Sequence, residues 1–223
     1  MARSRMLSPG NIVGHVLMAT VWAGVLLSGP AAPSVAFLYF LGSRALYVSF
    51  VGFSLRAQDE SGWWTRRWGP EGGFHRFKFA CTFIMHNDAV SIAMVCWTSR
   101  MTLGESVPLG VLEAVGIALI FFGVGMKAWA VATLGKGSYF WRSFFIPHAH
   151  TKYVVAGPYR WFENPMYTVG YAQAYGIALC LASLPGLIAS LVAQCLVLVL
   201  NHWAEKPHTE KMRERTPEAE AAA

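Results

Sequence analysis

Six long apolar stretches, separated by short polar segments, dominate this 223-residue sequence. A helix that crosses the core of a bilayer needs about 20 mainly apolar residues, and the stretches reach or approach that length. They cover residues 11–28, 34–55, 77–98, 107–134, 166–183 and 185–204. With only 13% charged residues, the chain also falls short of the roughly one quarter that is usual in soluble domains. The sequence therefore predicts an all-α, polytopic integral membrane protein with about six transmembrane helices.

The connections between the stretches predict a topology. Leu184-Pro185-Gly186 joins the last two, which indicates a C-terminal helical hairpin. In a six-span arrangement the loops on one side of the membrane contain a single basic residue, Arg100. All other basic loop residues lie on the opposite side of the membrane. The positive-inside rule then places both termini in the cytoplasm, with the chain in an inner (cytoplasmic) membrane or an endomembrane. Aromatic residues surround basic ones at 63–68 and 139–145, which indicates segments at the level of the lipid headgroups, either as simple anchors or to hold a headgroup close to a cytoplasmic site.

Composition argues against several classes of function. The net charge of +6 is spread over many loops, so we expect no nucleic-acid partner. The four cysteines lie inside apolar stretches without CxxC spacing, which predicts small buried residues and no metal site. The oligomeric state stays open.

A few charged residues interrupt the apolar stretches. Charges at membrane depth are costly and mark either pairing inside the bundle or function. Arg44 and Asp88 are expected to form an intramembrane ion pair that stabilises packing; the alternative is that they and His86 form a polar pocket for a lipid headgroup. Gly123-Val124-Gly125 opens a pattern similar to a dinucleotide-binding loop, but no strand precedes it, so close helix packing is the expected role.

Polar residues concentrate between 135 and 167 and again between 202 and 210, on either side of the predicted hairpin. The first region contains Gly157-Pro158-Tyr159 and, after a short gap, Asn164-Pro165-Met166-Tyr167. This pattern resembles the GPY…(H/N)PMY signature of membrane phospholipid N-methyltransferases and isoprenylcysteine carboxyl methyltransferases. The usual Arg-His-Pro is Glu163-Asn164-Pro165 here, and the asparagine form resembles the phosphatidylethanolamine N-methyltransferases most.

Two further segments extend the resemblance over roughly residues 107–212. Glu205-Lys206-Pro207-His208-Thr209 is similar to the Glu-Glu-Pro-x-Thr segment of that superfamily, with Lys206 in place of the second glutamate. Leu134-Gly135-Lys136-Gly137 is similar to its Gly-x-Gly segment. On this basis residues 1–106 are expected to form N-terminal transmembrane helices, residues 107–215 a methyltransferase-like core with a cytoplasmic cofactor site, and residues 216–223 a disordered tail.

The resemblance implies an enzyme that uses S-adenosylmethionine to methylate a membrane phospholipid in the bilayer, with phosphatidylethanolamine favoured as the acceptor. An aromatic face attracts a sulfonium or methylated ammonium group, and some base must take the proton of the attacking amine. The candidates for that base are Glu205 and His208. The cofactor-binding candidates are Gly135, Gly137, Gly157, Pro158, Tyr159, Arg160, Asn164, Pro165, Tyr167 and Glu205.

Three alternatives remain at this stage. An isoprenylcysteine-type or other small-molecule methyltransferase would use the same chemistry on another acceptor. A membrane reductase with a nicotinamide cofactor would share a similar C-terminal arrangement. A non-catalytic lipid-binding or transport protein would fit the substitution at Lys206.

Overall fold

The computed structural model describes residues 32–104, 107–135, 138–146 and 154–214. Over these residues all regular structure is helical, which confirms the all-α prediction for the described chain. The helices are α2 (Pro33–Ser61), α3 (Trp63–Thr98), α4 (Leu109–Leu134), α5 (Ala172–Cys180), α6 (Leu184–Leu200) and α7 (Lys206–Glu214). Short 3₁₀ turns lie at Ser138–Phe140, Arg142–Phe144, Gly157–Arg160 and Val169–Tyr171, and a π-helical turn, Asn201–Glu205, joins α6 to α7.

Four helices in the described residues are long and apolar enough to cross a membrane, fewer than the six spans predicted. They are α2, α3, α4 and the continuous helix Leu184–Glu214, which contains α6 and α7. The first predicted span, 11–28, lies outside the described residues. The prediction for 166–183 is wrong, because the only α-helix in that stretch is α5, and its nine residues extend about 13 Å, far less than the bilayer core.

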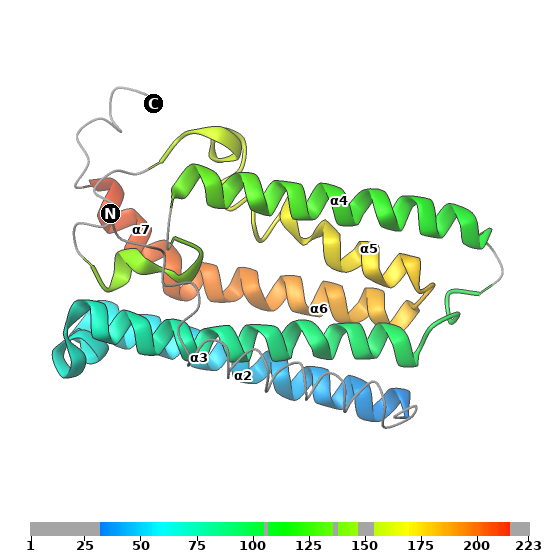
Figure 1. Cartoon of the computed structure of the whole chain (residues 1–223), viewed down its shortest axis with the longest axis horizontal. Coiled ribbons are helices and arrows are strands. Elements are labelled where there is room, and N and C mark those ends of the chain that lie inside the picture. The colour runs from blue at the N-terminus through cyan, green and yellow to red at the C-terminus, as the bar shows by residue number, and fades with distance from the viewer. Residues whose placement is uncertain (1–31, 105–106, 136–137, 147–153, 215–223) are drawn as a thin grey trace, which may run out of the picture.

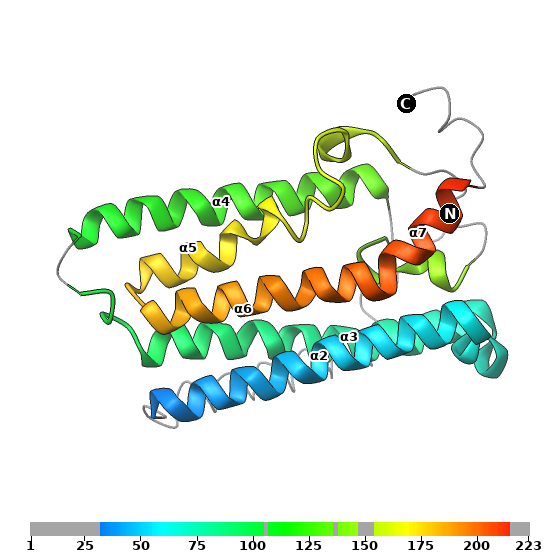
Figure 2. The ribbon, with the colours of Figure 1, turned by 180° about the vertical axis from the view of Figure 1, so that it is seen from behind.

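The long helices run side by side in one bundle (Figures 1 and 2). A short turn at residues 181–183 lets α5 run back along α6 (Figure 1). Helix α4 packs on α5, α5 on α6, and α6 on both α2 and α3. Helix α4 buries only Gly116, Gly123 and Ala130, so most of its apolar surface faces outward. A helix that is apolar all round and little covered by protein is suited to contact with lipid.

Local sequence sets the ends of these helices. Pro33 occupies the first turn of α2, where its missing N–H costs nothing. Gly62, with φ of 64°, ends α2 in the left-handed conformation, and Gly69, with φ of 70°, kinks α3 after Trp68; the two glycines together turn the chain back on itself. The Ser183 side chain caps α6 by accepting from the Gly186 amide at 2.9 Å.

The predicted pair of buried charges is confirmed. Arg44 of α2 lies 2.6 Å from Asp88 of α3, measured from Nη2 to Oδ2, and both side chains are almost fully buried. Arg44 also donates to the Tyr171 hydroxyl at 3.0 Å. The cysteines follow the expectation less well: Cys81 and Cys96 are buried, but Cys195 is exposed on α6.

Close packing of α4 against the start of α5 depends on a small residue, as the sequence predicted for Gly123. A Cβ atom added there would lie 2.4 Å from the Gln173 amide nitrogen, a backbone atom that has no room to move. Gly125, two residues further along the same helix, faces open space. The two glycines therefore have different roles in spite of their shared motif.

We expect Gly123→Ala to lower the free energy of unfolding by about 1–3 kcal/mol, because the added methyl group forces α4 away from its neighbour. Gly125→Ala is the matched control and should leave stability unchanged or raise it by up to about 1 kcal/mol, since alanine favours a helix over glycine. Thermal unfolding of both variants in the same detergent checks this. Equal unfolding temperatures would contradict the packing role of Gly123.

Candidate functional site

A cavity of about 240 Å³ lies at one end of the bundle, where α7 meets the loops that follow α4. Its walls come from four segments that are far apart in the sequence: the end of α4, residues 139–144, residues 154–167 and residues 201–213. The two regions where polar residues concentrate in the sequence thus meet around one space. We refer to it as the first cavity.

A hydrogen bond joins two of the site candidates across the first cavity. The Tyr167 hydroxyl donates to the Glu205 carboxylate, Oε1, at 2.8 Å. Glu205 closes the π-helical turn between α6 and α7. Turns of this kind are rare and occur often at functional sites, because the extra residue redirects the side chains that follow. Here the turn coincides with the point where a carboxylate lines the cavity.

The Asn-Pro-Met-Tyr segment forms a tight turn that positions Asn164 and Tyr167. The Asn164 carbonyl accepts from the amides of Tyr167 and Thr168 at 3.2 and 3.1 Å. Gln194 of α6 donates its side-chain amide to the carbonyls of Tyr167 and Thr168, both at 3.1 Å. Hydrogen bonds within its own backbone and from the Gln194 side chain of α6 therefore both stabilise the turn.

The Gly-Pro-Tyr segment forms a 3₁₀ turn against the end of α4. Gly157 adopts a φ of 54°, and a Cβ atom there would lie 2.5 Å from the Thr133 hydroxyl oxygen. Only glycine satisfies both conditions without strain. The turn brings the Tyr159 ring to the wall of the first cavity.

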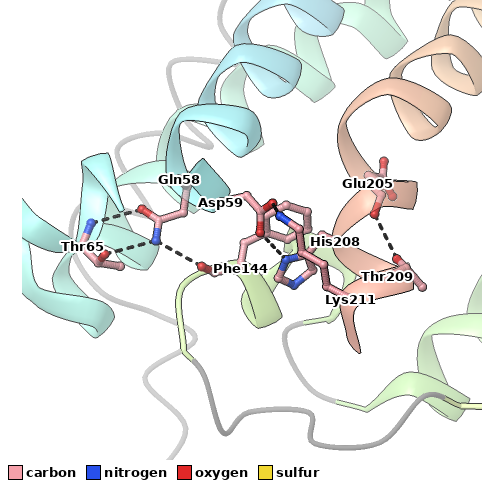
Figure 3. A network of polar contacts seen from close by, with 8 residues as sticks. All are labelled: Gln58, Asp59, Thr65, Phe144, Glu205, His208, Thr209 and Lys211. Carbon is pink, nitrogen blue, oxygen red and sulfur yellow. Dashed lines mark hydrogen bonds and ion pairs between the residues drawn. The ribbon is translucent and has the colours of Figure 1, made fainter. Parts of the chain in front are cut away.

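A polar network at the end of α2 fixes the opposite wall (Figure 3). The Gln58 amide donates to the Phe144 carbonyl at 3.1 Å, which ties the loop after α4 to α2. The Phe144 ring stacks on the imidazole of His208, with the centroids 3.7 Å apart. His208 and Lys211 of α7 both contact the Asp59 carboxylate, at 2.8 and 2.6 Å. Helix α2, from the half of the chain without a recognised motif, thus holds α7 in place.

Buried polar atoms around the first cavity indicate that it is suited to a polar ligand. Tyr159 Oη and Asn164 Oδ1 are buried and have no hydrogen-bond partner within the described chain, and both residues line the cavity. Such atoms cost free energy unless a ligand or water satisfies them. Burial and the nearby charge of Glu205 raise the pKa of the Tyr159 hydroxyl, which keeps it protonated and able to donate. The cavity thus offers a hydrogen-bond donor, an acceptor and a carboxylate to a polar ligand.

The structure brings five of the eleven predicted site residues into the first cavity. Its lining includes Tyr159, Asn164, Tyr167, Glu205 and His208. The remaining candidates lie near it without lining it: Gly135 ends α4, Gly157 and the buried Pro158 and Pro165 shape the turns, and Arg160 is exposed. Gly137 lies outside the described residues.

Residues of the aromatic segment 139–145 contribute to the walls of the site. The segment was expected at the headgroup level, but Trp141, Phe144 and Phe145 are buried inside the protein. Tyr139 and Trp141 line the first cavity. Aromatic residues beside arginine occur in both settings, so the pattern alone could not separate a cavity wall from an interfacial anchor.

The two departures from the superfamily's charge pattern lie next to each other. Lys206 Nζ is 3.9 Å from the Glu163 carboxylate. The resemblance places an arginine where Glu163 stands and a glutamate where Lys206 stands, so the signs of both charges are exchanged together. The two positions thus keep opposite charges in this chain. Both side chains are well exposed, and such a pair contributes at most about 1 kcal/mol.

Comparison with known proteins identifies the region that forms this site. Residues 111–215 match the family model for phospholipid methyltransferase. Similar proteins include the phosphatidylethanolamine N-methyltransferases of Meyerozyma guilliermondii, 31% identical over 99 residues (44% of this chain and 11% of the relative), and of Emericella nidulans, 29% identical over 135 residues (60% and 12%).

A longer match covers more of the N-terminal half. The phosphatidylethanolamine N-methyltransferase of Arthroderma otae is 24% identical over 208 residues, which is 88% of this chain and 21% of that protein. The chain thus spans between 11% and 21% of the length of these three relatives. No solved structure matches the chain.

Proposed function

With a phospholipid methyltransferase domain over residues 111–215 as the premise, we propose that this chain transfers methyl groups from S-adenosylmethionine to the amine of phosphatidylethanolamine. The observation that carries the proposal is the first cavity. Five of the site candidates meet in it although they come from two separate regions of the sequence. The cavity lies beside helices long and apolar enough to cross a membrane, as methylation of a lipid in place requires.

The residues of the first cavity have distinct parts in this proposal. Tyr159 and Asn164 would satisfy the polar groups of S-adenosylmethionine, which supplies the methyl group. Glu205 would hold the cofactor through its carboxylate, which Tyr167 and Trp141 keep in position. Tyrosine faces also favour a positive centre beside them. Holding the amine nitrogen in line with the methyl group, away from water, is the main requirement of such a displacement.

Transfer of radiolabelled methyl groups tests the proposal directly. The purified protein is incubated with labelled S-adenosylmethionine and bilayers that contain phosphatidylethanolamine, and the lipid extract is separated by chromatography. We expect label in mono-, di- or trimethylated phosphatidylethanolamine. Label that appears only with an isoprenylated acceptor would overturn the choice of substrate, and absence of both label and cofactor binding would overturn the function.

The part played by His208 can be separated from that of its neighbours. In the structure its imidazole contacts Asp59 and Phe144, so we expect it to act by positioning α7. Asp59→Ala and His208→Ala should then weaken cofactor binding by a similar factor of about ten, the effect of one lost charge-assisted hydrogen bond. His208→Gln, which keeps a donor for Asp59, should bind nearly normally.

Cofactor affinity and the rate of methyl transfer are measured for all three variants. A His208→Gln protein that binds the cofactor but transfers no methyl group, beside an active Asp59→Ala protein, would contradict positioning and assign the proton transfer to His208.

A further inference from the structure

A second cavity of about 260 Å³ lies between α2, α3, α4 and α5, deeper in the bundle than the first. The two cavities share four wall residues, Tyr139, Trp141, Met166 and Tyr167. They are therefore neighbours, and a molecule in the second cavity can reach toward the first. The proposed cofactor site leaves the second cavity without a role.

The second cavity contains more positive than negative charge. Arg44, Lys127 and Asp88 line it, and Asp88 pairs with Arg44. Lys127 forms no ion pair among the described residues; its ammonium group lies 5.2 Å from the centre of the Tyr171 ring. An uncompensated cation in a membrane helix is costly, and by default it marks a functional site.

The Arg44–Asp88 ion pair has polar atoms that form no hydrogen bond among the described residues. Arg44 Nε and Asp88 Oδ1 are buried without a hydrogen-bond partner in the described part of the chain. Arg44 is 2% exposed, and its Nη2 donates to the Tyr171 hydroxyl, which has a lone pair and a rotatable proton to offer. Arg44, Tyr171 and Lys127 thus form a continuous set of donors around one space.

The backbone is shaped to accommodate Lys127. The aliphatic part of its side chain passes over Gly170, where an added Cβ atom would lie only 2.9 Å from Lys127 Cγ. Gly170 is itself fixed by a hydrogen bond of 2.8 Å from its amide to the Pro165 carbonyl. The turn that positions Tyr167 in the first cavity therefore also leaves room for Lys127 in the second.

The second cavity is accessible from the side of the bundle. Its rim on α3 includes the exposed residues His86 and Ala89, and on α4 the partly exposed Lys127. Both helices are long and apolar enough to cross a membrane, and they lie on the outside of the bundle (Figures 1 and 2). The cavity is therefore open toward an apolar flank of the bundle.

We propose that the second cavity is the subsite for the phosphodiester group of a glycerophospholipid, with Lys127, Arg44 and the Tyr171 hydroxyl as its ligands. The phosphate compensates the charge of Lys127 and takes up the free Arg44 Nε donor. The amine of the same headgroup then points past Tyr167 toward the first cavity, and the acyl chains leave between α3 and α4. This proposal rests on the proposed function, because it assigns a binding site to the lipid that accepts the methyl group.

Binding of dioctanoyl phosphatidylethanolamine, measured by native mass spectrometry in detergent, tests the subsite without any need for catalysis. We expect Lys127→Met to weaken this binding about tenfold, the effect of one lost charge-assisted contact. Lys127→Arg should retain it, since a cation at this position is what the phosphate requires. Glu113→Gln, an exposed charge on the same helix outside both cavities, is the control and should bind normally.

Further probes separate the possible ligands. Dioctanoylglycerol, which lacks the phosphate, should bind equally well to the native protein and to Lys127→Met. Inorganic phosphate that binds as tightly as the lipid would overturn the assignment to a phospholipid, and equal lipid binding by Lys127→Met and the native protein would overturn the subsite. Lipid binding that depends on Lys127, with no methyl transfer by the native protein, would support the subsite and contradict the proposed function alone.

Discussion

Glu205→Gln is expected to weaken S-adenosylmethionine binding about a hundredfold, and the rate of methyl transfer at low cofactor concentration should fall with it. The Tyr167 hydroxyl and the Trp141 side chain both hydrogen-bond to this carboxylate and fix it at the wall of the first cavity, where it faces a ligand. Glutamine has the same shape, and its amide oxygen can still accept from Tyr167, but it removes the negative charge. Losing charge-assisted hydrogen bonds to a ligand accounts for an effect of this size.

Two comparisons make the result specific. Glu214→Gln changes an exposed carboxylate at the end of the same helix, outside both cavities, and should bind the cofactor normally. Tyr167→Phe removes one of the hydrogen bonds that hold the carboxylate but leaves its charge, and should weaken binding less than Glu205→Gln. Equilibrium binding of the labelled cofactor measures all three. Native affinity in Glu205→Gln would show that the carboxylate is not a cofactor ligand.

Asp88→Ala is expected to lower the free energy of unfolding by about 3–5 kcal/mol, because it leaves Arg44 buried without its partner. The pair is close, with 2.6 Å between Nη2 and Oδ2, and no other carboxylate in the described chain pairs with Arg44. The double variant Arg44→Met with Asp88→Leu removes both charges and fills their space with apolar groups. It should recover most of the lost stability.

Unfolding by titration with a denaturing detergent measures these differences. A single variant that is as stable as the native protein would mean that Arg44 is already compensated by another group. The double variant also separates stability from recognition: it should be folded, yet it should bind dioctanoyl phosphatidylethanolamine more weakly, because Arg44 is one of the phosphate donors.

The sequence predicted the structure best where a physical rule constrains an individual residue, such as a buried charge or a glycine at a helix contact. A charge at membrane depth needs a partner, so Arg44 and Asp88 could be paired from the sequence alone. The small residue Gly123 in an apolar helix indicated close packing, and the structure shows it. The order of the motifs indicated which residues would lie together, and Tyr159, Tyr167 and Glu205 line one cavity.

Hydropathy was misleading where apolar residues are buried by protein instead of lipid. Residues 166–183 are apolar enough for a span, but the Asn164 turn and the 3₁₀ turn Val169–Tyr171 occupy the first part, and α5 packs between α4 and α6. The π-helical turn at Glu205 and the contact of Asp59 with His208 depend on tertiary packing, for which a single sequence contains no signal.

The Arg44–Asp88 pair also constrains how this protein is made. Translation delivers α2, with its arginine, before the aspartate of α3 exists, and Tyr171 follows much later. An isolated α2 would carry an unpaired guanidinium into the translocation channel. The short reversal between Gly62 and Gly69 offers a solution: both helices can enter the lipid together as a preformed pair, with their charges already neutralised, and α4 to α7 can then assemble on that hairpin.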